Sequence, residues 1–331
     1  IFNKDINSLS KIMNTSKSSL SKFLGVNIVS IAPVFEFVFS NSFGNGPNFL
    51  LYDSFNNLLW TGQGDNNYSN SYLLKISPDN LTLLGQVQIN QGWGGPIINK
   101  DCDSSYVFGG APGYVIFRVD KSTMEVTYSG WNYHSPGGIL RFGNDLWVAS
   151  YWGYKRVSPS TLEQINSYNT EFNGSIVSDG SYLYLFKGWN RTLFYKINPS
   201  DGTILLTGDA GVTPGNDIIQ KVDWVYYDNK VWVVLSNGSI SAYNISNFSL
   251  VGNYPVFNCS GINFVNGYAY VITNDSTNYG TIKKYSLPSF SLVSQFEYNM
   301  GLTSIQNDGS YLYVIASSGD ALKKLLKIPV F

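Results

Sequence analysis

Charged residues are scarce in this chain. Asp, Glu, Lys and Arg make up 13% of its 331 residues, about half the usual share, and the formal net charge is −1. No long basic or acidic run occurs, which makes nucleic acid and anionic membrane surfaces poor candidate partners. Tyr, Asn, Ser and Gly take the place of charged groups, a composition that favours an extracellular or acidic setting.

Histidine and cysteine are nearly absent. His134 is the only histidine, so a histidine-based metal cluster is excluded, and no Ser-His-Asp set is spelled out. Cys102 and Cys259 stand in separate repeats of the pattern described below, and a disulfide needs Cα atoms within about 7 Å. We therefore expect two free, buried or half-buried cysteines, no metal, no cofactor and no conventional catalytic site.

Long apolar runs are also missing. The most apolar stretch, residues 26–39, is short and contains Asn27, Ser30, Pro33 and Glu36, so no transmembrane helix is predicted. The chain begins with Ile1 and not with Met, which suggests a processed or partial product.

Short strands and turns are abundant instead. Residues 173–206 read as four strands, because apolar and polar side chains alternate between clusters of Gly, Pro, Asn, Asp and Ser. The end of the third strand recurs at intervals of 38 to 47 residues, at Pro78, Lys121, Pro159, Pro199, Ser246, Pro288 and Pro329. A repeat of about 40 residues with four strands is typical of a propeller blade.

The repeats predict an all-β fold, a seven-bladed β-propeller of four-stranded antiparallel blades. The predicted blades are 48–90, 91–130, 131–168, 169–208, 209–254, 255–298 and 299–331 with 33–41. The last repeat lacks a fourth strand, and residues 34–39 form an isolated strand before the first repeat. Because open edges invite aggregation, we expect this N-terminal strand to complete the last blade and close the ring.

Residues 1–32 lie outside the repeat. Apolar residues at helical spacing, such as Ile6, Leu9 and Met13, predict a partly helical N-terminal arm. The arm either packs on the propeller or docks the chain into a larger assembly.

Aromatic and basic residues gather in the loops of one predicted face. In a propeller, the loops that enter each first strand lie on the same face as those that join second to third strands. The candidate ligand-binding residues on these loops are Trp93, Trp131, Tyr133, His134, Trp152, Tyr154, Arg156, Trp189 and Arg191. Flat rings beside amides and hydroxyls suit sugar rings or a protein hot spot. Alternatively, the rings fill gaps between blades.

Ten Asn-X-Ser/Thr sequons favour a secreted or surface glycoprotein. They are at Asn14, Asn67, Asn80, Asn173, Asn190, Asn237, Asn244, Asn247, Asn258 and Asn274.

Two segments carry a family resemblance. Asp179 to Leu185 with Lys196 to Thr203, echoed by Asp308 to Ile315, resemble the YVTN/NHL-like group of seven-bladed propellers. The resemblance implies a mostly non-enzymatic protein of prokaryotic, often archaeal, cell surfaces, and the charge-poor surface looks similar to exterior proteins of archaeal viruses.

We therefore expect a non-enzymatic recognition head on a virion spike or cell surface that binds an envelope glycan or a surface receptor. The alternatives are a structural envelope or capsid-associated subunit that contacts only protein neighbours, and a glycan-active hydrolase or lyase.

Overall fold

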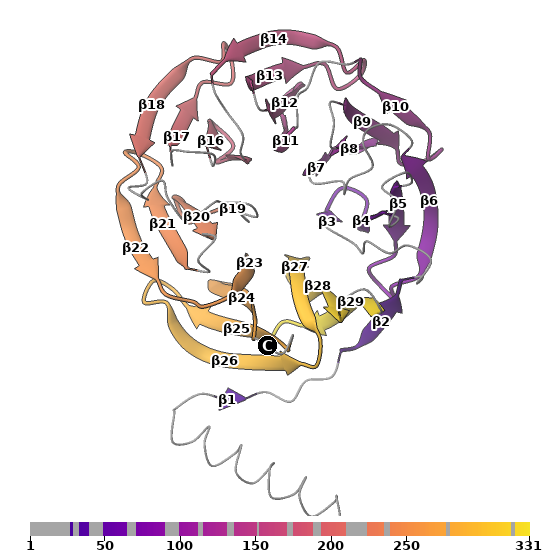
Figure 1. Cartoon of the computed structure of the whole chain (residues 1–331), viewed down its shortest axis with the longest axis vertical. Coiled ribbons are helices and arrows are strands. Elements are labelled where there is room, and N and C mark those ends of the chain that lie inside the picture. Colours follow the sequence, from indigo (N-terminus) through magenta and orange to yellow (C-terminus); the bar gives the residue numbers. More distant parts are fainter. Residues whose placement is uncertain are drawn as a thin grey trace, which may run out of the picture.

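The computed structural model describes residues 27–28, 33–39, 49–64, 71–89, 99–111, 115–130, 136–150, 152–170, 175–187, 193–209, 224–234, 239–275, 279–318 and 322–331. Within these ranges the chain forms 29 strands and no helix. They make seven sheets arranged in a ring (Figure 1), which confirms the predicted seven-bladed β-propeller.

Each blade is an antiparallel meander whose first strand lies innermost and whose fourth lies outermost (Figure 1). Blade 1 contains β3 (Leu50–Asp53), β4 (Leu58–Gly64), β5 (Ser71–Ile76) and β6 (Leu83–Ile89). Blade 2 contains β7 (Asn99–Cys102), β8 (Tyr106–Ala111), β9 (Val115–Asp120) and β10 (Val126–Tyr128). Blade 3 contains β11 (Gly138–Phe142), β12 (Asp145–Ser150), β13 (Gly153–Val157) and β14 (Gln164–Asn169).

Blade 4 contains β15 (Ile176–Ser178), β16 (Leu183–Lys187), β17 (Leu193–Ile197) and β18 (Ile204–Asp209). Blade 5 contains β19 (Trp224–Tyr227), β20 (Lys230–Val234), β21 (Ile240–Asn244) and β22 (Leu250–Tyr254). Blade 6 contains β23 (Cys259–Val265), β24 (Tyr268–Asn274), β25 (Gly280–Ser286) and β26 (Ser291–Tyr298). Blade 7 contains β27 (Gly301–Asn307), β28 (Tyr311–Ser318), β29 (Leu322–Pro329) and, as its outermost strand, β2 (Phe35–Val38).

Strand β2 closes the ring as expected. It pairs antiparallel with β29, in a register that places Phe35 opposite Lys327. Glu36 on β2 forms an ion pair of 2.7 Å with Lys324 and accepts a hydrogen bond of 2.8 Å from Tyr298 of blade 6. The two ends of the chain therefore share one sheet, which is also tied to its neighbour.

The N-terminal arm is described only at β1 (Asn27–Ile28), and the predicted helices lie outside the described residues. Strand β1 runs parallel to β26 and adds a fifth strand to the outer edge of blade 6.

The apolar core is divided among the blade junctions. Seven clusters of buried side chains each combine residues of two neighbouring blades; Tyr270 and Ile282 of blade 6, for example, pack with Leu312 and Leu326 of blade 7. A single blade thus buries its faces only against its neighbours, which is why the sequence repeats the unit.

Cations on the third strands link successive blades. Lys75, Arg118, Arg156, Lys284 and Lys327 each donate to a main-chain carbonyl just beyond the third strand of the next blade. Several also lie over a tyrosine of their own second strand; the Lys327 ammonium, for example, is 4.1 Å from the Tyr311 ring centroid. These cations satisfy carbonyls on the side of the ring that carries the short turns.

Candidate functional site

The two faces of the ring differ in their connections. We call the loop face the side that carries the connections into each first strand and those between second and third strands. The turn face carries the connections between first and second strands and between third and fourth strands. Because consecutive strands of a blade are antiparallel, the two classes lie at opposite ends.

Most of the predicted ligand-binding residues cannot be placed. Six of them, Trp93, Trp131, Tyr133, His134, Trp189 and Arg191, lie outside the described residues.

Trp152 lies on the loop face, in the connection between β12 and β13, with 55% of its surface exposed. A large aromatic side chain that is exposed at this level contributes little to the core. Trp152 therefore stays a candidate for ligand contact.

The expectation that Tyr154 lies on a loop is wrong, because Gly153 begins strand β13. Gly153 has a φ of +131°, and a Cβ there would collide with the carbonyl oxygen of Tyr168. It is thus a strand glycine held against β14. Tyr154 is buried and donates a hydrogen bond of 2.6 Å to the carbonyl of Gly202 in blade 4, and burial raises its pKa to about 12.

The same correction applies to Arg156, which is also in β13. Its guanidinium forms an ion pair of 2.6 Å with Asp145 and donates to the carbonyl of Ser200 in the next blade. These bonds join blades 3 and 4 on the turn face, away from the predicted aromatic loops.

Two exposed aromatic residues of the loop face were missed by the sequence analysis. Phe257, before β23, has 80% of its surface exposed, and Tyr279, before β25, has 54%. The loops of blade 6 contain no tryptophan. An aromatic residue between Asn, Pro and Gly neighbours was the available signal, in Pro255 to Asn258 and in Asn278 to Gly280.

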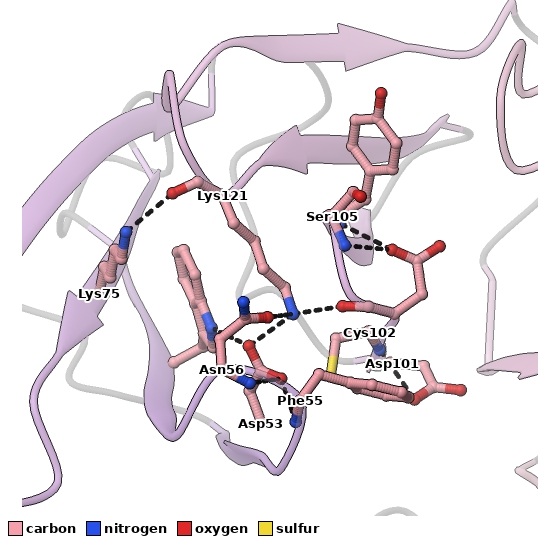
Figure 2. Close-up of polar contacts among 11 residues, drawn as sticks. Asp53, Phe55, Asn56, Lys75, Asp101, Cys102, Ser105 and Lys121 are labelled. Atoms are coloured by element: carbon pink, nitrogen blue, oxygen red, sulfur yellow. Dashed lines mark hydrogen bonds and ion pairs between the residues drawn. The ribbon is translucent and has the colours of Figure 1, made fainter.

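A buried charge pair lies on the turn face between blades 1 and 2 (Figure 2). The Lys121 ammonium lies 2.5 Å from Asp53 Oδ2, and the two side chains are 5% and 0% exposed. The ammonium also donates to Asn56 Oδ1, at 2.9 Å, and to the carbonyl of Asp103. Its three N–H groups thus have three acceptors, so this lysine holds two blades together with its donors fully used.

Asp53 is equally well satisfied. Its Oδ1 accepts hydrogen bonds from the main-chain N–H of Phe55 and Asn56, and its Oδ2 accepts one of 3.4 Å from the Trp60 indole. Asp103, Asp179 and Asp308 cap the equivalent turns of blades 2, 4 and 7 in the same way. The carboxylate is thus a turn cap of the repeat, to which the neighbouring blade adds a buried ammonium at Asp53.

A hollow of about 380 Å³ adjoins the pair. It is polar and is lined by Asn56, Leu58, Lys75, Ser104, Ser105, Asp120, Lys121 and Ser122. Lys75 already donates to the carbonyl of Lys121 at 2.8 Å, and Asp120 Oδ1 accepts from Ser122 and Thr123. The lining groups are mainly occupied by bonds within the blades.

A buried carboxyl group and a buried thiol lie next to this cluster. Asp101 accepts hydrogen bonds from the main-chain N–H of Cys102 and Arg141, and burial raises its pKa to about 6. Burial also raises the pKa of the Cys102 thiol well above its usual range, which keeps it protonated and unreactive. Neither Cys102 nor Cys259 forms a disulfide, and the first is buried and the second half-buried, as expected. The described residues contain no group of three His, Cys, Asp or Glu that could hold a metal ion.

The sequons that can be placed are often turn motifs. Asn80 Oδ1 accepts a hydrogen bond from Thr82 Oγ1 at 2.8 Å, and Asn244 Oδ1 accepts one from Ser246 Oγ at 2.7 Å. Asp120 with Ser122 and Asp201 with Thr203 make the same bonds in other blades, although an aspartate carries no N-glycan. Thus the Asx-X-Ser/Thr pattern stabilises turns that precede outer strands.

The remaining sequons divide by placement. Asn247 and Asn258 are exposed, whereas Asn274 is half-buried and bonded to Leu302. Asn14, Asn67, Asn173, Asn190 and Asn237 lie outside the described residues.

Comparison with known proteins identifies the fold and no family. No protein-family model matches the chain, and no curated protein matches it. Among solved structures, the chain is similar to the WD40 domain of Neurospora crassa Pan2, with a TM-score of 0.69, 11% identity and coverage of 92% of this chain and 98% of that one.

It is also similar to BamB from Moraxella catarrhalis, with a TM-score of 0.59, 10% identity and 86% of both chains covered. The computationally designed protein Ika8 gives a TM-score of 0.58, with 12% identity and coverage of 89% and 99%. At these identities the likeness establishes a propeller fold only, and the resemblance to the YVTN/NHL-like group stays a prediction.

In the part of the chain that the structure describes, no helix has the length and apolar character needed to cross a membrane.

Proposed function

We propose that this chain is a non-enzymatic, extracellular recognition propeller that binds an envelope glycan or surface receptor through aromatic side chains of its loop face. The observation that carries the proposal is the exposure of Trp152, Phe257 and Tyr279 on that one face. A rigid ring that presents flat aromatic side chains on loops is a common arrangement for binding.

The polar groups of the turn face support a binding role over catalysis. Asp53 and Lys121 neutralise one another within the blade junction, and the Cys102 thiol is buried. Chemistry on a substrate would require such groups to be accessible and free to exchange protons or attack. We therefore propose that the chain is not an enzyme and works without a cofactor.

The setting we propose is the exterior of a cell or virion, as a member of a larger surface assembly. A charge-poor chain rich in Tyr, Asn and Ser supports this setting. The resemblance to YVTN/NHL-like propellers makes an archaeal cell surface part of the proposed setting. The ten sequons support an extracellular setting less strongly than their number implies, because several of them have a structural role in turns.

The test is binding of the purified chain to a panel of cell-envelope glycans. We would compare the parent with a Trp152→Ala/Trp189→Ala double variant, and with Phe55→Ala as the matched control. Phe55 is 63% exposed but lies on the turn face, between β3 and β4. Each lost ring contact should cost on the order of 1 kcal/mol.

Binding that the double variant loses and Phe55→Ala keeps would support recognition through the loop face. If no glycan binds the parent, or if the control loses binding equally, the proposed site is wrong. In that case the structural-subunit alternative becomes the better account.

A further inference from the structure

In five blades the outer edge strand carries little charge and no proline against strand addition, although a β-bulge lies where each of these strands begins. Edge strands normally carry lysine, proline or inward charges that prevent another chain from pairing with them. Strands β6, β14 and β22 contain no charged residue and no proline. Strand β18 has only Asp209 at its end, and β26 only Glu297 near its end.

Exposed aliphatic side chains occur where these outer strands begin. They recur at the same place in five blades and are 37% to 55% exposed: Leu83, Leu84, Ile165, Ile204, Leu205, Leu250, Val251 and Val293. Blades 3 to 6 are consecutive, so these exposed side chains recur on four neighbouring outer strands. Single exposed aliphatic residues are ordinary, but their recurrence at one position in successive blades singles out these edges.

One of these edges is already occupied. Strand β1 pairs in parallel with β26, with Asn27 beside Ser294 and Ile28 beside Gln295, directly after Val293. Ser294 is paired on its inner side with Lys284 of β25. The positions with the same register in blades 4 and 5 are Leu206, opposite Lys196, and Gly252, opposite Ala242.

The equivalent edges of blades 4 and 5 take no strand of this chain among the described residues, where β18 and β22 are the last members of their sheets. Each begins with an aliphatic pair, Ile204–Leu205 and Leu250–Val251, just before the position at which β1 pairs in blade 6. Both edges thus offer the same uncharged, apolar pairing site as β26, and so does the edge of blade 1, where β6 begins with Leu83–Leu84 and is the last strand of its sheet.

We propose that the outer rim of blades 1, 4 and 5 binds the N-terminal segment of a second copy of this chain by parallel strand addition. The segment is residues 25–32, Gly-Val-Asn-Ile-Val-Ser-Ile-Ala, which contains β1. It has no charge and four β-branched residues, which suit an uncharged edge. Main-chain hydrogen bonds provide the affinity, and the aliphatic pair selects the register.

The pairing within one copy is short. Within the described residues β1 pairs over two residues, so moving it to an equivalent edge of another copy gives up few hydrogen bonds, and a high concentration of the chain offsets the entropy lost on association. The segment and the edges of blades 1, 4 and 5 are different surfaces, so the contact is head-to-tail and the assembly grows with concentration. This rim is separate from the loop face, and the inference does not depend on ligand recognition.

The first test is the molar mass of the full-length chain in solution over a hundredfold range of concentration. We expect the mass of the parent to rise with concentration. We expect two variants to stay monomeric: Leu84→Lys/Leu205→Lys/Val251→Lys, which charges the rim, and Asn27→Pro/Ile28→Pro, which removes two main-chain N–H groups of the segment. Phe55→Lys is the matched control, since it replaces an exposed apolar residue away from the rim, and it should assemble like the parent.

A second readout follows the segment itself. A fluorescent peptide of residues 22–33 is titrated against the full-length parent, with anisotropy as the signal. Binding should weaken at least tenfold in the rim variant, and a peptide with proline at positions 27 and 28 should not bind.

Three results would overturn the proposal. The first is a parent that stays monomeric and binds no peptide. The second is assembly of the rim variant at the parent's level. The third is equal binding of the proline peptide.

Discussion

Removing the buried ammonium of Lys121 should strongly destabilise the ring. Lys121→Met keeps most of the side-chain volume but leaves the Asp53 carboxylate buried without its counter-charge. It also leaves Asn56 Oδ1 and the Asp103 carbonyl without this donor. Breaking a buried pair from one side costs about 3–5 kcal/mol, because the remaining charge is uncompensated.

A double variant separates this penalty from the value of the pair. In Asp53→Asn/Lys121→Met neither charge of the pair remains, and the amide oxygen introduced at position 53 can still accept from the main-chain N–H groups that Asp53 caps. We expect the double variant to recover most of the loss, with a coupling free energy of about 2–3 kcal/mol. Without that coupling, Lys121 would be a turn residue with no electrostatic role.

The assay is urea unfolding of the parent, the two single variants and the double variant at pH 7, followed by tryptophan fluorescence and circular dichroism. Coincident transitions license a free energy of unfolding for each. A cost below about 1 kcal/mol for Lys121→Met, or additive single effects, would refute the reasoning.

Three further predictions concern stability. Gly202→Ala should cost about 1–3 kcal/mol more than Gly180→Ala; both glycines have positive φ, but of the two only Gly202 lies where a Cβ would collide with a ring, that of Tyr168. Equal losses in urea unfolding would contradict this. Because the folded pKa of Asp101 is about 6 against an ordinary 3.8, its contribution to stability should fall as pH rises from about 4 to 6. The loss is up to about 3 kcal/mol and is absent in Asp101→Asn; parallel pH profiles of the two proteins would contradict it. Deleting residues 1–41 removes β2 and should lower the melting temperature of the whole ring, and unchanged melting would disprove closure by β2.

The architecture was predictable because it depends on local, repeated signals. Strand alternation, turn residues and a period near 40 residues recur along the chain, so errors in single strands do not change the fold. The isolated N-terminal strand was recognised because the last repeat lacked one, and β2 occupies that place.

Side-chain roles were less predictable, because they depend on the neighbouring blade. Gly153 resembles a loop glycine in the sequence, but it lies in a strand, where a Cβ would collide with the main chain of β14. This close contact with β14 places the next residue, Tyr154, in the core. Lys121 stands where most other blades have proline, and no pattern shows that its ammonium reaches Asp53, 68 residues earlier. The sequons match the pattern of glycan acceptors, although the same spacing makes hydrogen-bonded turns.

The exposed aromatics of blade 6 were overlooked for a related reason. Sequence alone does not tell whether an isolated ring such as Phe257 is packed or exposed, and only the strand boundaries place it on the loop face.

Hydrogen exchange of the full-length chain with and without the best glycan of the panel tests the central claim most directly. We predict that ligand slows exchange at the β12–β13 connection around Trp152 and at residues 255–258, and leaves the turns at 53–57 and 179–182 unchanged. Protection confined to the turn face, or spread evenly over the ring, would contradict recognition through the loop face.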